Sequence, residues 1–123
     1  MEYAKSFREL EVYILSRLLS KEIFELTREF PKTETYSLID QVRRSSRSIG
    51  AQVAEAWAKR RYEKHFISKL TDADGEQLET PHWLEIARDC GYLSDEKAKD
   101  LIARYASIGK MLYSMINKAR AFC

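Results

Sequence analysis

The chain has 123 residues, of which 45% are hydrophobic and 33% are charged, and its net charge at pH 7 is +2. This length suits one domain, so we expect a single domain over residues 1–123. The charged start MEYAKSFREL lacks the apolar run of a signal peptide, and no stretch of about 18 apolar residues could span a membrane. We therefore expect a cytoplasmic protein without a membrane partner. Four Gly and two Pro leave few turns, and the many helix formers favour an all-α fold.

Apolar residues at helical spacing predict a first helix over residues 7–30. The main stripe of this helix is Phe7, Leu10, Ile14 and Leu18, and beside it lie Val12, Leu15, Leu19, Ile23 and Leu26. Pro31 closes it, because proline has no amide proton and disfavours helical geometry in the residue before it. A second helix is predicted to end at residues 60–62. Its apolar series is Leu38, Val42, Ser46, Ile49, Val53 and Trp57.

A third series, which contains Phe66, Leu70, Ala73, Gln77, Leu84 and Ala87, is interrupted by Pro81. A proline inside a helix costs about 3 kcal/mol, so either the helix is kinked there or a new helix starts with Thr80 as its N-cap. The pair Cys90–Gly91 is typical of a helix C-terminus, since glycine adopts the left-handed cap without strain.

Ser94 and the acidic residues after it predict the start of a fourth helix. The apolar residues of this helix are Ala98, Leu101, Ile102, Tyr105, Ile108, Leu112, Met115, Ile116 and Ala119. Short connections favour antiparallel neighbours, so we predict an antiparallel up-down-up-down four-helix bundle. In this bundle, residues 72–79 of the third helix should lie beside residues 45–52 of the second.

Some apolar and small residues lie outside the main stripes. On a helical wheel two aromatic residues share a second side of the first helix, and a tryptophan and an isoleucine do so on the third. Small residues on the second helix would let another helix approach closely. Because exposed apolar patches usually mark contacts, we expect a homo-oligomer, with a wider monomer core as the alternative. The predicted interface residues are Tyr13, Phe24, Gly50, Ala54, Trp83 and Ile86.

Residue types that would support catalysis are sparse. The sequence has no nucleophile elbow or Gly-rich loop. His65 and His82 do not form an i, i+4 pair, and no HExxH motif or Cys/His cluster accompanies them, so we predict no metal site. Cys90 and Cys123 lack a CxxC partner, which predicts a buried thiol and a frayed C-terminal thiol. We expect neither an enzyme nor a cofactor.

Charge is unevenly distributed along the chain. Residues 41–64 hold seven basic and two acidic residues, a net charge of +5, whereas residues 72–96 hold one basic and eight acidic residues, a net charge of −7. Three interpretations stay open: salt bridges between these strips within the chain, phosphate binding by the basic strip, and head-to-tail pairing of subunits in a ring. Residues 59–61 also lie where cations stabilise a helix C-terminus. The candidate nucleic-acid contacts are Arg43, Arg44, Arg47, Lys59, Arg60 and Arg61.

Several stretches carry a resemblance to a known family: FRELEVY, FPKTETYSLIDQVRRSSRSIGAQVAEAWAKR, DCGYLSDEK and IGKMLYSMI. The most specific is QVRRSSRSI followed by VAE. On these residues the chain resembles the ribosomal RNA intervening-sequence proteins of bacteria, a family of four-helix bundles. It departs at Gln52, where members usually have Asn, and at Gly50 and Ala56, where they usually have Pro and Gly.

The resemblance implies an up-down bundle that assembles into a homopentamer and has no known catalytic activity. Similar proteins are accessory factors of diversity-generating retroelements, in which a basic pentamer binds nucleic acid and a reverse transcriptase. Arg43 and Arg44 match the family's basic pair. We therefore expect a non-enzymatic oligomer that binds RNA or DNA, with a reverse transcriptase as partner in a retroelement context. A protein-interaction or assembly module with no nucleic-acid role is the alternative.

Overall fold

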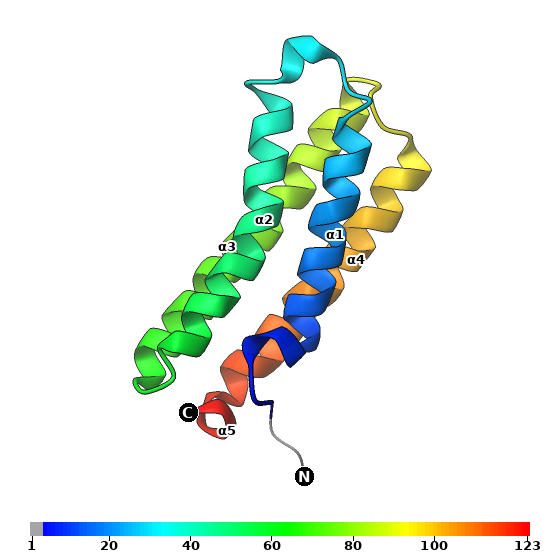
Figure 1. Cartoon of the computed structure of the whole chain (residues 1–123). Helices are drawn as coiled ribbons and strands as arrows, with labels where there is room; N and C mark the ends of the chain where they lie inside the picture. The colour runs from blue at the N-terminus through cyan, green and yellow to red at the C-terminus, as the bar shows by residue number, and fades with distance from the viewer. Residues whose placement is uncertain (1–3) are drawn as a thin grey trace.

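The computed structural model describes residues 4–123, which form four long helices that alternate in direction (Figure 1). These helices are α1 (Glu11–Thr27), α2 (Leu38–Ala58), α3 (Glu63–Asp89) and α4 (Asp95–Asn117). Shorter elements lie at the ends of the bundle: the 3₁₀ turns η1 (Phe7–Glu9) and η2 (Lys32–Glu34), and the helix α5 (Ala119–Phe122). No strand occurs in this part of the chain, and the predicted all-α bundle with antiparallel neighbours is confirmed.

The core lies between the four helices, each of which buries residues at three- and four-residue steps. Tyr105 and Phe66 are its largest fully buried side chains. The stripes predicted for α2, α3 and α4 face this core, and only Trp57, Ile102 and Ile116 among them remain half-buried. Among the described helices, none combines the length and the apolar character needed to cross a membrane.

The apolar series predicted for α1 is confirmed in part, because Val12, Leu19 and Ile23 are buried whereas two residues of the main stripe are not. Ile14 and Leu18 are each 54% exposed, because they lie on the side of α1 that faces away from the core. The buried residues of α1 are Val12, Ser16, Leu19, Ile23 and Thr27. Two of them are polar, and each hydroxyl donates to a carbonyl one turn earlier, at 2.9 Å for Ser16 and 2.7 Å for Thr27. A pattern of apolar residues does not identify buried Ser and Thr residues whose hydroxyl groups bond to carbonyls of their own helix.

Helix α1 is also shorter than predicted. Leu10 has an extended backbone, with φ −71° and ψ 131°, and separates η1 from α1. At the other end the helix stops at Thr27, and single-turn hydrogen bonds carry the chain through Phe30 to Pro31. The predicted segment of residues 7–30 is therefore a 3₁₀ turn followed by a separate α-helix.

Helix α3 continues through Pro81 without a break in its assignment. Thr80 is fully buried inside the helix, and its hydroxyl donates to a carbonyl one turn back at 2.9 Å, so it is not an N-cap. Its oxygen also lies 2.8 Å from the hydroxyl oxygen of Ser45 on α2. Lys69 donates to Gln52, with 3.5 Å between Nζ and Oε1. These two contacts confirm the predicted alignment of residues 72–79 with residues 45–52.

The connection between α3 and α4 follows the prediction. Gly91 has a φ of 78°, and the amide of Tyr92 donates to the carbonyl of Ala87 at 2.9 Å, which forms a Schellman cap. Ser94 caps α4 by accepting a hydrogen bond from the amide of Lys97 at 3.1 Å. These caps allow a sharp reversal of the chain between two long helices.

The expected burial of a cysteine is not observed. Cys90 is exposed, because it is the C-cap residue of α3 at the point where the chain leaves the helix. Cys123 is exposed at the end of the chain. Neither thiol therefore belongs to the hydrophobic core.

An ion-pair network joins α1 to α4. The guanidinium group of Arg104 donates to both carboxylate oxygens of Glu22, one of them at 2.8 Å, and to Asp100 at 2.9 Å. Lys97 lies 3.7 Å from the same Glu22 carboxylate. Hydrogen bonding by Arg104 holds the pKa of Glu22 below its usual value, against the opposing effect of burial.

This lowered pKa predicts a pH dependence of stability. The stabilising contribution of Glu22 should be fully present above its unfolded pKa of about 4.5, and it should be lost as the pH falls through the lower folded value. We expect Glu22→Gln to have a lower Tm than the wild type at pH 7 and a smaller loss of Tm between about pH 6 and pH 3. Thermal unfolding followed by circular dichroism measures both. The control is Glu29→Gln, since Glu29 is exposed and has no ion pair within 4.0 Å in residues 4–123. An unchanged acid profile in Glu22→Gln would contradict the assignment.

Candidate nucleic-acid interface

Arg43 is directed into the contact between α1 and α2. Its Nε donates to the hydroxyl of Thr27 at 2.8 Å, and a terminal nitrogen donates to the carbonyl of Phe24 at 3.4 Å. The guanidinium carbon lies 4.7 Å from the centre of the Phe24 ring, which is within cation–π range. These contacts connect α1 to α2. Because they occupy several hydrogen-bond donors of the half-buried Arg43, few donors remain to bind a phosphate group.

Arg44 and Arg60 also have partners within the chain. Arg44 lies on the α3 side of α2, and its largely exposed side chain is 3.9 Å from Asp40. Arg60 stacks on Trp57, with 3.6 Å between the guanidinium carbon and the ring centre, and its Nε donates to the carbonyl of the same residue at 2.8 Å. Arg60 therefore completes the C-terminal turn of α2.

Direct salt bridges between the two charged strips do not form. Within residues 4–123, no ion pair of 4.0 Å or less joins a basic residue of 41–64 to an acidic residue of 72–96. Arg43 and Arg47 face α1 rather than α3, so they cannot reach the acidic strip. Lys69 of α3 instead pairs with Glu55 of α2 at 3.1 Å, so in this pair the basic residue lies on α3 and the acidic residue on α2. The interpretation of direct salt bridges between the strips is therefore not supported in the described residues, although the charge of Arg44 acts on the nearby carboxylate of Glu76.

Like charges consequently remain together on the acidic strip. Burial, and then the neighbouring charge of Glu79, raise the pKa of Glu76. Both carboxylates line a polar hollow on the α2–α3 face, together with Arg44. In the described part of the chain, no cluster of three or more His, Cys, Asp or Glu residues is arranged to hold a metal ion.

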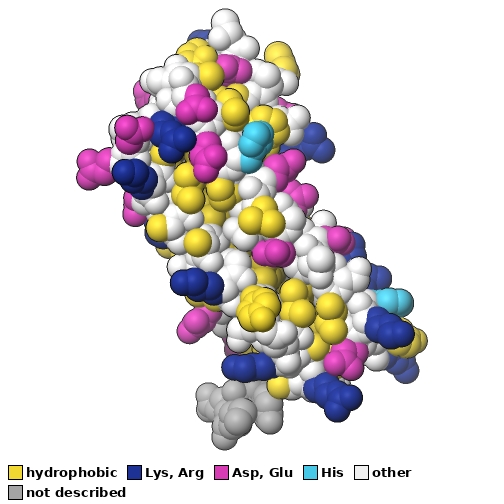
Figure 2. Space-filling model, turned by 180° about the vertical axis from the view of Figure 1, so that it is seen from behind, with side chains coloured by type: hydrophobic (Ala, Val, Ile, Leu, Met, Phe, Trp, Pro, Cys, Tyr) yellow, Lys and Arg dark blue, Asp and Glu magenta, His cyan; other side chains and the backbone are white. Residues whose placement is uncertain are grey.

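The remaining cations gather at one end of the bundle. The aromatic ring of Phe122 in α5 stacks on that of Phe66 in α3, with 5.7 Å between ring centres, and this contact brings the C-terminal segment to the α2–α3 turn. Figure 1 shows the turn and α5 at the same end, and Figure 2 shows Lys and Arg side chains there. We call this surface the basic end, and it consists of Lys59, Arg61, Lys64, Lys118 and Arg120.

All five residues of the basic end are exposed, and none lies within 4.0 Å of a carboxylate in residues 4–123. The sequence analysis identified Lys59 and Arg61 but missed Lys118 and Arg120. The sequence signal that could have identified them is the apolar series of the fourth helix, which continues to Ala119. Ala119 is buried, and the cations Lys118 and Arg120 flank it in the sequence.

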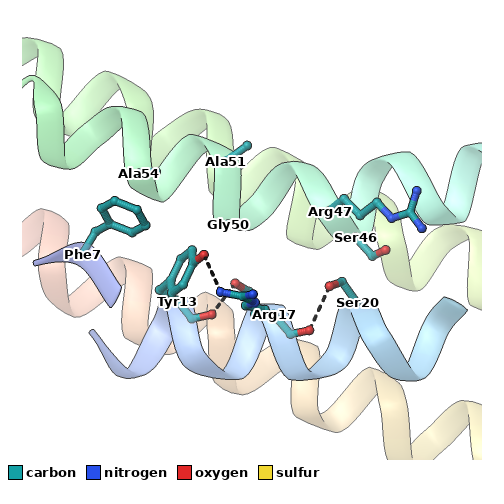
Figure 3. Close-up of a pocket in the computed structure, with 10 residues that line it drawn as sticks. Phe7, Tyr13, Arg17, Ser20, Ser46, Arg47, Gly50, Ala51 and Ala54 are labelled. Carbon is teal, nitrogen blue, oxygen red and sulfur yellow. Dashed lines mark hydrogen bonds between the residues drawn. The ribbon is translucent and has the colours of Figure 1, made fainter. Parts of the chain in front are cut away.

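Arg47 lies in a groove between α1 and α2 (Figure 3). This α1–α2 groove has a volume of about 250 Å³ and is lined by Phe7, Tyr13, Ser16, Arg17, Ser20, Ser46, Arg47, Gly50, Ala51 and Ala54. Arg17 supplies a second exposed cation, from the wall opposite Arg47, which the sequence analysis did not identify. No carboxylate is among the lining residues, so the groove is positively charged.

Close packing at Gly50 forms the floor of the α1–α2 groove. A Cβ atom at this position would lie 3.4 Å from the hydroxyl oxygen of Ser16 and 3.5 Å from the ring of Tyr13. These are ordinary van der Waals distances, so α1 and α2 are packed in direct contact at this point. Ala51 and Ala54 continue the same small surface along α2.

The residues predicted for an oligomer interface all pack within the chain. Tyr13, Gly50 and Ala54 line the α1–α2 groove, and Phe24 lies under Arg43. Trp83 and Ile86 pack against the edge of the core. All six are half-buried, whereas the most exposed large apolar residues are Ile14, Leu18, Tyr36, Tyr62, Leu78 and Tyr113. An interface at the predicted positions stays a prediction.

The sequence model of the 23S rRNA-intervening sequence protein family matches residues 8–114. The chain belongs to this family. The chain is also similar to the crystal structure of a protein of unknown function from the S23 ribosomal protein family of Bacteroides thetaiotaomicron. That structure has a TM-score of 0.77 and 29% identity to this chain, and the match covers 85% of this chain and 97% of the other. No curated protein matches the sequence.

The family match includes part of the basic end and all of the α1–α2 groove except Phe7. Lys118 and Arg120 lie beyond the matched range. The basic end thus combines a segment that the intervening-sequence family model describes with a C-terminal segment that it does not.

The contacts of Arg43 predict a structural effect on mutation. Arg43→Ala should lower the free energy of unfolding by about 2 kcal/mol, because it removes charged hydrogen bonds and a cation–π contact. Arg61→Ala should change it by less than about 0.5 kcal/mol, because Arg61 is exposed and makes no ion pair within residues 4–123. Urea unfolding of the two variants provides the comparison. Equal stability would show that the Arg43 contacts contribute nothing to the fold.

Proposed function

We propose that this chain is a non-enzymatic nucleic-acid-binding protein that contacts phosphate groups through the basic end and functions as a homo-oligomer. The observation that carries the proposal is the convergence of five exposed Lys and Arg side chains from two distant segments, with no paired carboxylate in residues 4–123. A pentamer is the assembly that the family resemblance implies, and a reverse transcriptase is the partner that it implies in a retroelement context.

Attraction for phosphate groups depends on the cations of the basic end and not on the net charge of the whole molecule. A net charge of +2 gives the whole molecule little attraction for a polyanion. Unpaired cations at one end nevertheless displace the counterions that surround phosphate groups, and each neutralised phosphate contributes a salt-dependent gain in affinity. In a ring in which subunits share one orientation, the basic ends would lie on one rim and their charges would add.

Binding across a salt series tests this proposal. We expect affinity for a structured RNA or a duplex DNA to fall linearly with salt on logarithmic axes between about 50 and 200 mM. Replacing both Lys59 and Arg61 by Glu should lower affinity at least tenfold and reduce the slope by about two, because two phosphate contacts are lost. Fluorescence anisotropy with labelled nucleic acid measures both quantities.

The matched control replaces Lys32 and Lys99 by Glu. These exposed lysines lie in η2 and the first turns of α4, at the other end of the bundle, so the net charge changes equally. An equal loss of affinity in both double variants would show that only net charge matters. If neither nucleic acid binds even at low salt, the proposed nucleic-acid function is wrong.

An assembly module without a nucleic-acid role is the second candidate, and the outer face of α3 and α4 favours it. Leu78 is 62% exposed and Tyr113 is 69% exposed. A second groove, of about 410 Å³, runs between these helices, and Figure 2 shows apolar side chains gathered on this face. Its lining residues are Asp74, Gln77, Ala106, Gly109, Lys110, Tyr113 and Ile116. Exposed apolar surface of this kind is typical of a contact between proteins.

This face predicts the behaviour of the chain in solution. Light scattering at micromolar concentration should return a multiple of the chain mass of 14.4 kDa. The double variant Leu78→Asp with Tyr113→Asp should shift the mass toward that of one chain, because burying two carboxylates at an interface is costly. Tyr36→Asp is the control, since this 95% exposed residue lies in the α1–α2 connection. A monomeric wild type would contradict the homo-oligomer.

A further inference from the structure

The geometry points to the α1–α2 groove as a binding site for single-stranded nucleic acid, along which one strand runs from the basic end to Arg47. This inference rests on the proposed nucleic-acid function and specifies which form of nucleic acid is bound. The groove differs from the basic end because it has walls, a floor, cations and aromatic rings within one hollow (Figure 3).

The two cations of the groove are available to a ligand. Arg17 makes one long hydrogen bond, with 3.4 Å between its terminal nitrogen and the hydroxyl of Tyr13. Arg47 lies 5.8 Å from the centre of the Phe24 ring and has no ion pair in the described chain. Each guanidinium group therefore retains donors whose planar arrangement matches the oxygens of a phosphate.

Aromatic rings occupy the end of the groove nearer the α2 C-terminus. Phe7 and Tyr13 meet edge to face, with 4.9 Å between ring centres, and both line the hollow. Sites for single strands combine a positively charged groove with aromatic side chains on which bases stack. In a duplex the bases are stacked inside the helix, so only an unpaired strand can bring a base against these rings.

The floor and one hydroxyl group also suit a sugar-phosphate chain. Gly50, Ala51 and Ala54 leave room for a close approach of the ligand backbone. Ser20 and Ser46 donate their protons to helix carbonyls at 2.9 and 3.0 Å. Ser46 is only 1% exposed, so the half-buried Ser20 is the hydroxyl whose oxygen can accept a hydrogen bond from a sugar hydroxyl or a base amino group.

The last groove residue of α2, Ala54, lies five positions before Lys59 of the basic end. Eleven residues separate Arg47 from Ala58, which corresponds to about 16 Å of helix. A single strand that follows α2 over this distance meets Lys59 and Arg61 directly beyond it. A single strand can therefore contact both surfaces, whereas a duplex can reach only the basic end.

Anisotropy titrations with single strands of about ten nucleotides, one of RNA and one of DNA, and with the matching duplex test the inference. The key variant is Ala51→Glu, which places a carboxylate in the groove at an exposed position. Ala51→Gln is the matched control, with the same shape and no charge. We expect the wild type to bind the single strands at least tenfold more tightly than the duplex. Ala51→Glu should remove that preference and change duplex affinity less than twofold, and Ala51→Gln, which fills the same space without the charge, should lose measurably less of the preference than Ala51→Glu.

The outcomes separate this inference from the proposed function. If the Lys59→Glu and Arg61→Glu variant loses all binding while Ala51→Glu binds single strands like the wild type, the groove is not the site and the basic end alone is functional. A duplex bound as tightly as the single strands overturns the inference in the same way. If neither form binds at low salt, the proposed function fails with it. Circular dichroism of Ala51→Glu and Ala51→Gln verifies that both are folded, and the RNA and DNA arms show which sugar is preferred.

Discussion

The packing of α2 between α1 and α3 determines where the other parts of the molecule lie. On one side Arg43 binds the end of α1, and Gly50 packs against Ser16 and Tyr13 of the same helix. On the other side the hydroxyls of Ser45 and Thr80 form a buried contact at 2.8 Å. A change of register would break the contacts of Arg43 and the cross-helix contact of Thr80, although the hydroxyls of Ser45 and Thr80 would keep the carbonyls of their own helices. These polar contacts therefore fix the register of helices whose apolar surfaces alone would allow sliding.

This arrangement also separates the charges of α2 into groups with different roles. Residues that point toward a neighbouring helix, such as Arg43, hold the bundle together. Residues beyond the last turn have no neighbouring helix, so their cations remain in solvent and are joined by those of the C-terminal segment. The same strip of sequence thus supplies both structural arginines and a surface suited to phosphate groups. A loss of nucleic-acid binding in an Arg43 variant could therefore result from a less stable fold and would not identify Arg43 as a contact.

Much of the fold follows from the sequence because α2, α3 and α4 have regular apolar stripes and recognisable caps. The pattern failed in part at α1, where Ser16 and Thr27 occupy core positions while Ile14 and Leu18 face solvent. Hydroxyls that bond to their own helix behave as core residues, and hydropathy does not reveal this. The candidate site was less predictable. Helical periodicity identifies Arg47 as a flank residue, but only the tertiary structure brings Arg17 to the opposite wall and Lys118 to the basic end.

The placement of the two cysteines has a consequence for handling the protein. Cys90 ends α3, whereas Cys123 lies near the start of α3, where partial burial and then the charge of Glu63 raise the pKa of its thiol. The 27 residues of α3 separate the two thiols by about 40 Å. A disulfide requires Cα atoms within about 7 Å, so the two thiols of one folded chain cannot pair. Air oxidation can therefore link only different chains, and such chains would be joined end to end in linear products. A reducing agent is needed wherever the size of the non-covalent assembly is measured.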